Sequence, residues 1–248
     1  MRIRAMTEQD VPAGVHLNTI AGWNQTAADW IRFLRFSPDA CFVMEHQGEV
    51  IGTAATIPYG TRFAWIGMVL VDPRFRGQGA GTLLLERAIE HLSRSHIPVM
   101  KLDATPQGKP LYKKLGFMEE YELERWVLKR LPNQLPSSRA TLSELEWQRI
   151  LSIDRQVFGG DRSVLLRSLH SEFPELTFTS LDGGSLVGYA FGRHGLFADH
   201  FGPWVSEGPS KTVNLLNEFL RHSPRETIVV DCPKDNKAVL DALRENGR

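Results

Sequence analysis

The chain has 248 residues, of which 42% are hydrophobic and 23% are charged, a composition typical of a globular protein with one large domain or two of ordinary size. Lysine plus arginine and aspartate plus glutamate number 29 each, so the composition is not basic enough to suggest a nucleic-acid-binding surface. The two cysteines, Cys41 and Cys232, have no C-x-x-C spacing, and no signal peptide or membrane-length apolar run occurs, so we expect a cytoplasmic protein with no metal, nucleic-acid or membrane partner.

The N-terminal segment predicts a short strand followed by two helices. Residues 1–5, MRIRA, suit the strand, and Thr7 to Asp10 resembles a capping box, with Asp10 in place of the usual glutamate, that starts a helix to about Ile20. The segment from Ala21 to Thr26 breaks this helix, and a second helix with one apolar face follows.

The next segment predicts a hairpin and then a buried strand. Cys41–Glu45 and Val50–Ile57 are expected to pair across Gln47-Gly48. Ala64 to Val71 carries no charge, which suits a strand covered on both faces. Asp72-Pro73 ends that strand, because proline cannot donate to a ladder.

A glycine-rich turn from Arg76 to Gly81 joins this strand to a helix whose apolar residues recur with helical spacing from Leu85 to Leu92. The first turn of a helix has N–H groups without intrahelical partners, its dipole favours negative charge, and glycines let a phosphate approach closely. The Walker pattern G-x-x-x-x-G-K-[ST] is absent, and the dinucleotide pattern G-x-G-x-x-G fails at Thr82 when read from Gly77. We therefore expect a pyrophosphate site of another kind.

Two motifs carry a family resemblance. R-x-x-G-x-G begins at Arg76 after the V-x-V strand end, and PLYKKLGF follows at residues 110–117, roughly 30 residues further on. In this order they resemble the GNAT superfamily of acyl-CoA N-acyltransferases, which implies a mixed α/β (α+β) sheet fold and acetyl-CoA as co-substrate. The residues that the resemblance places at the coenzyme are Val69, Leu70, Val71, Arg76, Gly77, Gln78, Gly79, Ala80, Gly81 and Thr82.

The resemblance also implies a reaction, the direct attack of an amine on the acetyl thioester in a ternary complex. A backbone N–H near Leu70 would polarise the thioester carbonyl. Tyr112 matches the family tyrosine that protonates the leaving thiolate, although a plain packing role for its ring is the alternative. Residues 63–71 contain no carboxylate to act as base, so Asp29, Asp103, a water chain to either, and Asp199 or His200 in the second half stay open.

The acceptor is implied only in outline. In GNAT proteins the loop between the first two helices covers the acceptor site, which makes Trp23 and Asn24 candidates, with Asp29 just beyond them. Equally, Trp23 could be a packing residue and Asn24 a helix cap. We expect a small-molecule or peptide amine as acceptor and a monomer or homodimer as the working form.

The second half predicts a repeat of the first. Residues 132–138 have two prolines and no periodicity, so we expect domains at 1–131 and 139–248 with this segment as linker. Residues 48–55 align with 184–191 at an offset of 136, and residues 63–73 align with 197–207 at an offset of 134. The tandem arrangement resembles a bacterial two-domain GNAT subfamily with a divergent second unit.

The second copy departs from the first where the chemistry is expected. After Glu207 it lacks R-x-x-G-x-G, and no matching tyrosine precedes Asn246-Gly247. The chain ends at Arg248, where the first copy continues into two more strands, so the second copy is expected to be degenerate and incomplete at its C-terminal end. We therefore expect one acetyl-CoA site, with the second unit contributing a wall of the acceptor cleft through Trp204, His200 and Arg162. The alternative is that this unit packs away from the site and Trp204 fills its own core.

Two other classes of function remain as alternatives. A coenzyme-A-binding or sensor module without transfer activity would keep the anion turn and lose the proton chemistry. The missing carboxylate on the central strand favours it slightly, and Tyr112 disfavours it. A nucleotide-binding oxidoreductase is the weaker alternative, because the dinucleotide pattern fails.

Overall fold

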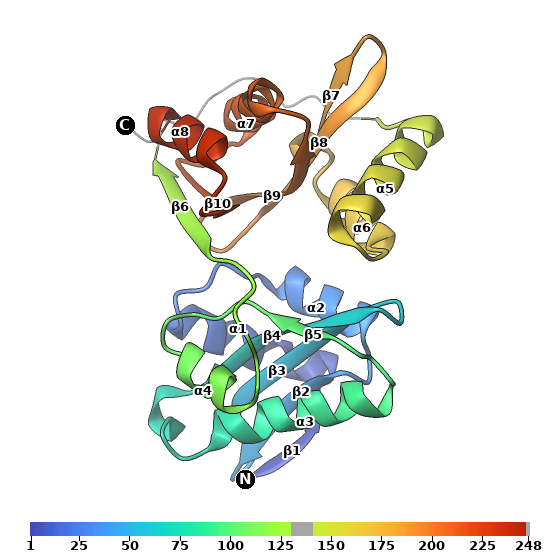
Figure 1. The fold of residues 1–248 in the computed structure, drawn as a ribbon. Helices are drawn as coiled ribbons and strands as arrows, with labels where there is room; N and C mark the ends of the chain where they lie inside the picture. Colours follow the sequence, from blue (N-terminus) through green and yellow to red (C-terminus); the bar gives the residue numbers. More distant parts are fainter. Residues whose placement is uncertain (130–140, 247–248) are drawn as a thin grey trace. The chain divides into compact units, whose positions relative to one another are not determined.

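The structure is a computed structural model that describes residues 1–129 and 141–246, so the predicted linker at residues 132–138 lies outside the described residues. The chain divides into two compact units, Met1–Met118 and Glu119–Arg248. Each unit is built on a five-stranded mixed sheet with helices on both faces, as Figure 1 shows. This confirms the predicted fold class.

The first unit follows the predicted order of elements closely. Its sheet has the order β1-β2-β3-β4-β5, in which only β4 and β5 are parallel. Its elements are β1 (Arg2–Ala5), η1 (Glu8–Asp10), α1 (Val11–Ile20), α2 (Ala27–Phe36), β2 (Cys41–His46), β3 (Glu49–Tyr59), β4 (Phe63–Val71), η2 (Pro73–Phe75), α3 (Ala80–Arg94), β5 (Met100–Leu102) and α4 (Lys109–Lys114). The β2–β3 hairpin turns at Gln47 and Gly48, both at positive φ, as their sequence predicts.

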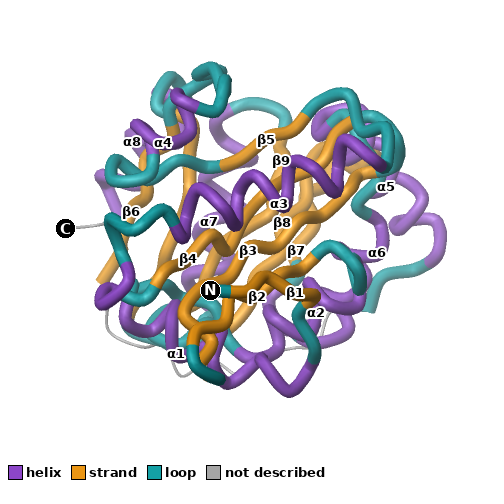
Figure 2. Tube along the Cα trace, turned by 90° about the horizontal axis from the view of Figure 1, so that it is seen from below, coloured by secondary structure: helices purple, strands orange, loops and turns teal. Residues whose placement is uncertain are grey.

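Two separate cores hold the first sheet between its helices. On one face α1 and α2 bury a cluster that includes Trp30, Val43 and Leu70. On the other face the apolar stripe of α3 packs on Ile51 and Ile66. Figure 2 shows α3 lying along the strands of this sheet. The sheet therefore presents β4 to a different helix layer on each side.

Capping boxes fix the start of both N-terminal helices. The Thr7 N–H and hydroxyl donate to Asp10, so the aspartate does replace the usual glutamate, and a 3₁₀ turn leads into α1. At α2, the Thr26 N–H donates to Asp29 Oδ2 over 2.8 Å, and the Asp29 N–H bonds back to the Thr26 hydroxyl. These caps position the loop between α1 and α2.

The second unit repeats this architecture with the sheet order β6-β10-β9-β8-β7, in which β9 and β10 are parallel. Helices α5 and α6 bury one core, and α7 and α8 bury the other. The elements are β6 (Leu123–Lys129), α5 (Glu144–Phe158), α6 (Ser163–Glu172), η3 (Pro174–Leu176), β7 (Phe178–Asp182), β8 (Ser185–His194), β9 (Asp199–Ser206), α7 (Pro209–His222), β10 (Thr227–Pro233) and α8 (Lys237–Asn246).

Strand β6 differs from the prediction. Residues 117–129 were expected to close the first sheet, with a domain boundary at 131. Instead β6 pairs antiparallel with β10 from Thr227↔Lys129 to Pro233↔Leu123, and Leu128 is buried in the core under α7 and α8. The unit boundary therefore falls after Met118. An edge strand also stands beyond β10, at the place where the second copy was expected to be incomplete.

The strand registers establish which residues of the two units are equivalent. Thr53 lies opposite Leu70 in the first sheet, and Tyr189 lies opposite Val205 in the second. A Cβ on Gly52 would meet the Leu70 carbonyl at 2.9 Å, and one on Gly188 would meet the Val205 carbonyl at 3.0 Å, so the same close approach recurs. The offset is therefore 136 for β3 and β8 but 135 for β4 and β9. The predicted offset of 134 is wrong by one residue.

Candidate active site

The turn before α3 leaves a row of backbone donors open. Gly77 and Gly79 have φ of +74° and +84°, conformations that favour glycine, and a Cβ at either would meet nothing within 4 Å. The first helical bond runs from Leu83 N to Gly79 O over 3.1 Å. Among the described residues, no acceptor takes the N–H groups from Gly77 to Thr82. Such a nest at a helix N-terminus is suited to a phosphate.

The two arginines of this turn have different roles. Arg74 pairs with Asp72 and Glu49, which ties the segment after β4 to the β2–β3 turn. Arg76 is exposed, its Nε donates to the Val71 carbonyl over 3.0 Å, and within the described part of the chain it forms no ion pair. The charge of Arg76 therefore stands beside the open N–H groups, where it adds to the attraction for an anion.

Next to this turn β4 parts from its neighbour. The parallel pairing with β5 covers only Ala64↔Met100 to Ile66↔Leu102. Beyond Ile66, residues 67–71 pair with β3 on one side, and no described strand pairs with them on the other. An extended chain could add to this edge through main-chain hydrogen bonds.

A β-bulge sits where the strands part. Thr53 opposes Leu70 and Ala55 opposes Gly67, so β4 has one extra residue there, and Met68 has φ of +53°. The Thr53 hydroxyl satisfies the Met68 carbonyl over 2.7 Å. In a regular strand Ile66 and Leu70, four residues apart, would face the same side. The bulge reverses the alternation, so Ile66 faces α3 while Leu70 faces α1 and α2.

Gly67 opens space beside the bulge. A Cβ there would meet nothing within 4 Å, although the glycine lies in the middle of a largely buried strand. An acceptor group could therefore approach the main chain at Leu70 from this side.

Tyr112 lies on α4, partly buried, with its ring against Phe117 at a centroid distance of 6.2 Å. Gly108 at the start of α4 lets the ring lie close, since a Cβ on Gly108 would be 2.8 Å from a Tyr112 ring carbon. The preceding residue, Leu111, lies close to Gly81 in the first turn of α3, since a Cβ on Gly81 would be 3.7 Å from the Leu111 side chain. This contact places α4 next to the glycine-rich turn. Burial raises the pKa of Tyr112, so its hydroxyl keeps its proton.

Asp103 follows β5 on the face that carries Trp65. The indole Nε1 of Trp65 donates to Asp103 Oδ2 over 3.1 Å. The structure therefore holds this carboxylate beside the point where β4 and β5 part. The second unit repeats the pairing, because His200 Nε2 lies 3.4 Å from Asp231 Oδ2 at the equivalent positions of β9 and β10.

The loop from Ala21 to Thr26 carries the two acceptor candidates. Trp23 packs partly against the core under α1 and α2, and Asn24 is half-buried. Asp29, expected as a base or acceptor residue, is instead a buried structural group. One of its oxygens caps α2, and the other receives the Arg32 guanidinium at 2.7 Å. This occupation of both oxygens leaves Asp29 poorly suited to take a substrate proton.

The structure does not gather the three candidates of the second unit. Arg162 is buried in an ion pair with Asp154 at 2.7 Å and lies over the Phe158 ring, so its charge is used within the unit. His200 lies on the strand face opposite to that of Phe201. Trp204 stacks on Phe201 in the core under α7 and α8. The Trp204 ring therefore packs against the core of its own unit, on the other face of the sheet from His200.

Asp199, the other base candidate of this half, is fully buried. It accepts from the Ser223 hydroxyl at 2.6 Å and binds His194 at 2.7 Å. These partners give it a structural role.

The second unit lacks an anion turn of the first kind. Helix α7 begins at Pro209, which has no N–H to offer, and the adjoining Glu207 is acidic. The Ser206 and Thr212 hydroxyls bond to each other at 2.5 Å beside the first turn of α7. At the bulge of β9, Pro203 removes a further donor. The missing N–H of Pro209 and the negative charge of Glu207 make this helix start less suited to an anion than the first turn of α3.

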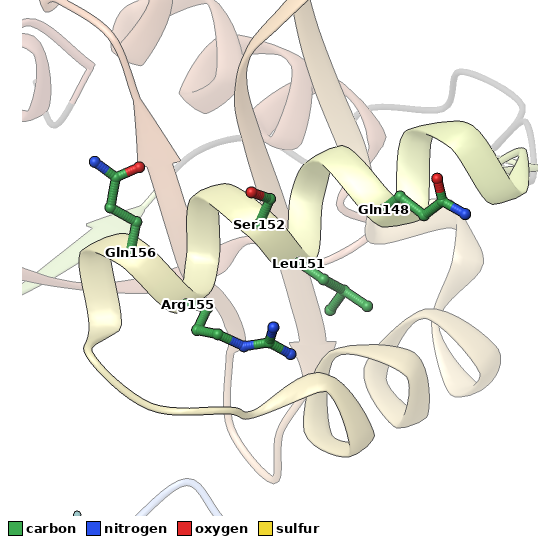
Figure 3. Close-up of a pocket in the computed structure, with 5 residues that line it drawn as sticks. All are labelled: Gln148, Leu151, Ser152, Arg155 and Gln156. Carbon is green, nitrogen blue, oxygen red and sulfur yellow. The ribbon is translucent and has the colours of Figure 1, made fainter.

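A surface hollow of about 470 Å³ runs along α5 (Figure 3). It is lined by Gln148, Leu151, Ser152, Arg155 and Gln156, and in Figure 3 these side chains point in different directions from one helix. The residues do not converge on a common point, so the hollow has no chemistry of its own.

Sequence reasoning missed three residues of the first unit. Asn18 anchors the loop after α1, Gly67 opens the strand face, and Gly108 admits the Tyr112 ring. Each acts through a neighbour that is distant in sequence or through space it leaves empty. Only Gly67, a glycine inside an apolar strand, carried a usable signal.

Comparison with known proteins agrees with this architecture. Residues 12–117 match the Acetyltransferase (GNAT) family, and residues 150–248 match an Acetyltransferase (GNAT) domain. A holothin acyltransferase of Pseudoalteromonas is 24% identical over 91% of this chain and 76% of its own length. An uncharacterized N-acetyltransferase of Bacillus subtilis, YitH, is 25% identical over 97% of this chain and 85% of its own.

Solved structures share the fold along almost the whole chain. A protein of Pyrococcus horikoshii described as an acetyltransferase superposes with a TM-score of 0.74 at 23% identity, covering 98% of this chain and 83% of its own. A GCN5-related N-acetyltransferase of Sphaerobacter thermophilus gives 0.69 at 17% identity, covering 97% and 90%. Fold and site together define an acyltransferase with two copies of one fold. The chain belongs to the GNAT superfamily of acetyltransferases, and a binding module without transfer activity is not favoured.

Among the described residues, no group of three or more His, Cys, Asp and Glu side chains is placed to hold a metal ion. Within the same residues, no helix has both the length and the apolar character needed to cross a membrane.

Proposed function

We propose that the first unit binds acetyl-CoA and transfers its acetyl group to the amine of a small molecule or peptide. The observation that carries this proposal is the row of open N–H groups from Gly77 to Thr82 beside the unpaired charge of Arg76. These groups would hold the pyrophosphate of the coenzyme. The open main-chain edge at Val69 to Val71 would bond to the amide groups of the pantetheine arm.

The reaction then proceeds by direct attack. The acceptor nitrogen forms a bond to the thioester carbonyl carbon, and the carbonyl oxygen takes up negative charge. A main-chain N–H near Leu70, next to the bulge, would donate to this oxygen as a fixed dipole. As the C–S bond breaks, the thiolate takes the proton of the Tyr112 hydroxyl.

The proton of the acceptor needs a separate destination. An alkylammonium has a pKa near 10.4, so it must lose a proton before it attacks. We propose that Asp103, held by the Trp65 indole at the splayed strands, receives this proton directly or through water. Asp29 in the first unit and Asp199 in the second have structural roles. Asp103 is the candidate that lies where β4 and β5 part.

Two observations favour some amines over others as the acceptor. One relative is named as an acyltransferase acting on holothin, and the balanced charge of this chain offers no field for a polyanion or polycation. We therefore propose a small amine as the first class to test and a peptide amine as the second.

Calorimetry with acetyl-CoA tests the coenzyme site. We expect one site per chain, and Gly79→Asp should abolish binding because its carboxylate would stand where the phosphate lies. Gly48→Asp is a matched control: Gly48 has φ of +82°, also faces open space, and lies in the β2–β3 turn. Two equivalent sites, or full affinity in Gly79→Asp, would contradict the proposal.

Release of free thiol from acetyl-CoA tests transfer. The panel would contain ethanolamine, putrescine, phenethylamine, lysine and a peptide with a free N-terminus. We expect amine-dependent thiol release together with the acetylated amine. Tight coenzyme binding without release on any amine would instead favour the binding module.

A further inference from the structure

Asn18 organises the loop that carries the acceptor candidates. It is fully buried on α1, and its Nδ2 donates to the Gln25 carbonyl over 3.0 Å. The main-chain carbonyl of Asn18 accepts from the Trp23 N–H over 2.8 Å. One residue thus holds the loop at two points, one on each side of Asn24.

The same side chain also joins the loop to the second helix. Asn18 Oδ1 accepts from Trp30 Nε1 over 2.8 Å, and Trp30 has no exposed surface. Gly14 lets this ring pack directly on α1, since a Cβ there would be 2.7 Å from the Trp30 ring. Asn18 is therefore fixed on one side by a rigid ring and presents its amide hydrogen to the loop on the other.

The second unit has a buried polar residue at the position of Asn18, but it is an aspartate. Asp154 on α5 stands 136 residues after Asn18, the offset that relates Tyr189 to Thr53. It is buried and binds Arg162, the residue before α6, as well as the Tyr189 hydroxyl. Both copies thus fasten the link between their first two helices through one buried polar side chain at the same position.

We infer that Asn18 is a positioning residue for the acceptor: it sets the conformation of the Ala21–Thr26 loop and so the affinity for the amine, without touching the coenzyme. This inference rests on the proposed acceptor role of the loop. A neutral amide suits the task because it both donates to the loop and accepts from Trp30, whereas an ionised carboxylate can only accept.

Asn18→Asp tests the inference by the smallest possible change. When ionised, the carboxylate keeps the bond from Trp30 but cannot donate to the Gln25 carbonyl, so repulsion between two oxygens replaces the loop contact. We expect the KM for the panel amine with the highest kcat/KM to rise about tenfold, with kcat and the acetyl-CoA dissociation constant within twofold of wild type. Trp30→Phe is the matched control, because it removes the other bond and leaves the loop contact, and it should change KM much less.

Asn18→Ser keeps the test decisive if the buried carboxylate prevents folding, since its short hydroxyl also loses the Gln25 contact. Hydrogen exchange should show faster exchange of the Trp23 amide in either variant, with α1 and α2 still protected. A folded variant with unchanged KM would overturn the inference, as would equal losses in acceptor KM and acetyl-CoA binding. Failure of the wild type to turn over any amine would instead count against the proposed function.

Discussion

Burial alone prepares Tyr112 for the role of an acid. The ring is packed against Phe117 and over Gly108, no described residue bonds its hydroxyl, and loss of solvent raises its pKa. A phenol of this kind stays protonated at neutral pH, yet it can donate to a thiolate that forms beside it.

Tyr112→Phe should therefore lower kcat by roughly 10²–10⁴-fold, the usual contribution of general acid catalysis, with little change in acetyl-CoA affinity. Stopped-flow measurement of thiol release, with chemistry shown to be rate-limiting, checks this. Tyr121→Phe removes a hydroxyl from an exposed tyrosine and should have no effect. A Tyr112→Phe enzyme with the wild-type kcat would exclude the acid role.

For single residues, the sequence predicted the features that depend on neighbours along the chain. The glycine-rich turn before a helix and the helical position of Tyr112 could be predicted, because the spacing of residues along the chain is itself the signal. The structural role of Asp29 and the burial of Arg162 could not, because their partners, Arg32 and Asp154, are decided by the helix packing. The packing of Trp204 on Phe201 could not be predicted for a related reason, since the face on which a strand residue points depends on a bulge that sequence does not show.

A polar cluster ties three elements of the second unit together. His194 at the end of β8 bonds Asp199 at the start of β9 over 2.7 Å, and Ser223 after α7 donates to the same buried carboxylate. Glu175 lies 3.3 Å from the other ring nitrogen of His194. The Phe173 ring packs edge-on against the imidazole, and Arg225 lies 3.3 Å from Asp199.

These contacts predict a pH-dependent stability. The hydrogen bond to Asp199 raises the pKa of His194 in the folded state, so the charged imidazole stabilises the fold. That contribution is complete below the unfolded pKa of about 6.5 and is lost as pH rises through the higher folded pKa. Urea unfolding at pH 6 and pH 8 should show that His194→Gln removes this difference. Because His200 has a lowered pKa and the opposite slope, the test is the difference between wild type and variant.

Strand β6 shows what an element's sequence leaves undecided. The pattern from Leu123 to Lys129 predicted a strand correctly, but the choice between β5 and β10 as partner depends on contacts far along the chain. A fragment of residues 119–248 should therefore unfold cooperatively in urea. A fragment of residues 141–248 lacks β6, uncovers the edge of β10 and should aggregate or unfold at lower urea. Equal stability of the two fragments would show that β6 is dispensable.

The two units share one fold, but only the first has the glycine-rich turn before its helix. Both units keep the mixed sheet, the bulge in the central strand, the close glycine at Gly52 or Gly188, and the buried anchor at Asn18 or Asp154. Weak self-similarity in the sequence was enough to predict the repeat. It placed the central strands one residue out of register, because only the pairing partners fix the count across a bulge.

We expect the first unit to bind the coenzyme and the second unit not to bind it. The first contains the open N–H groups, the free strand edge and Tyr112, and it has two cores of its own on the faces of its sheet. In the second unit, helix α7 begins with Pro209, which has no N–H, and no glycine-rich turn of the first kind precedes it. We therefore expect residues 1–118 to fold alone and to bind acetyl-CoA within a few-fold of the full-chain affinity.

Calorimetry on the two halves measures this directly, with residues 119–248 expected to give no heat of binding. The first fragment should end at Met118 rather than beyond Lys129, because a longer one carries β6 without its partner strand and exposes the apolar Leu128. Circular dichroism confirms that each half is folded before binding is compared. Binding by residues 119–248 would mean that the second unit holds a coenzyme site of another design. A folded first half that fails to bind would show that the N–H row at Gly77 to Thr82 is not sufficient by itself.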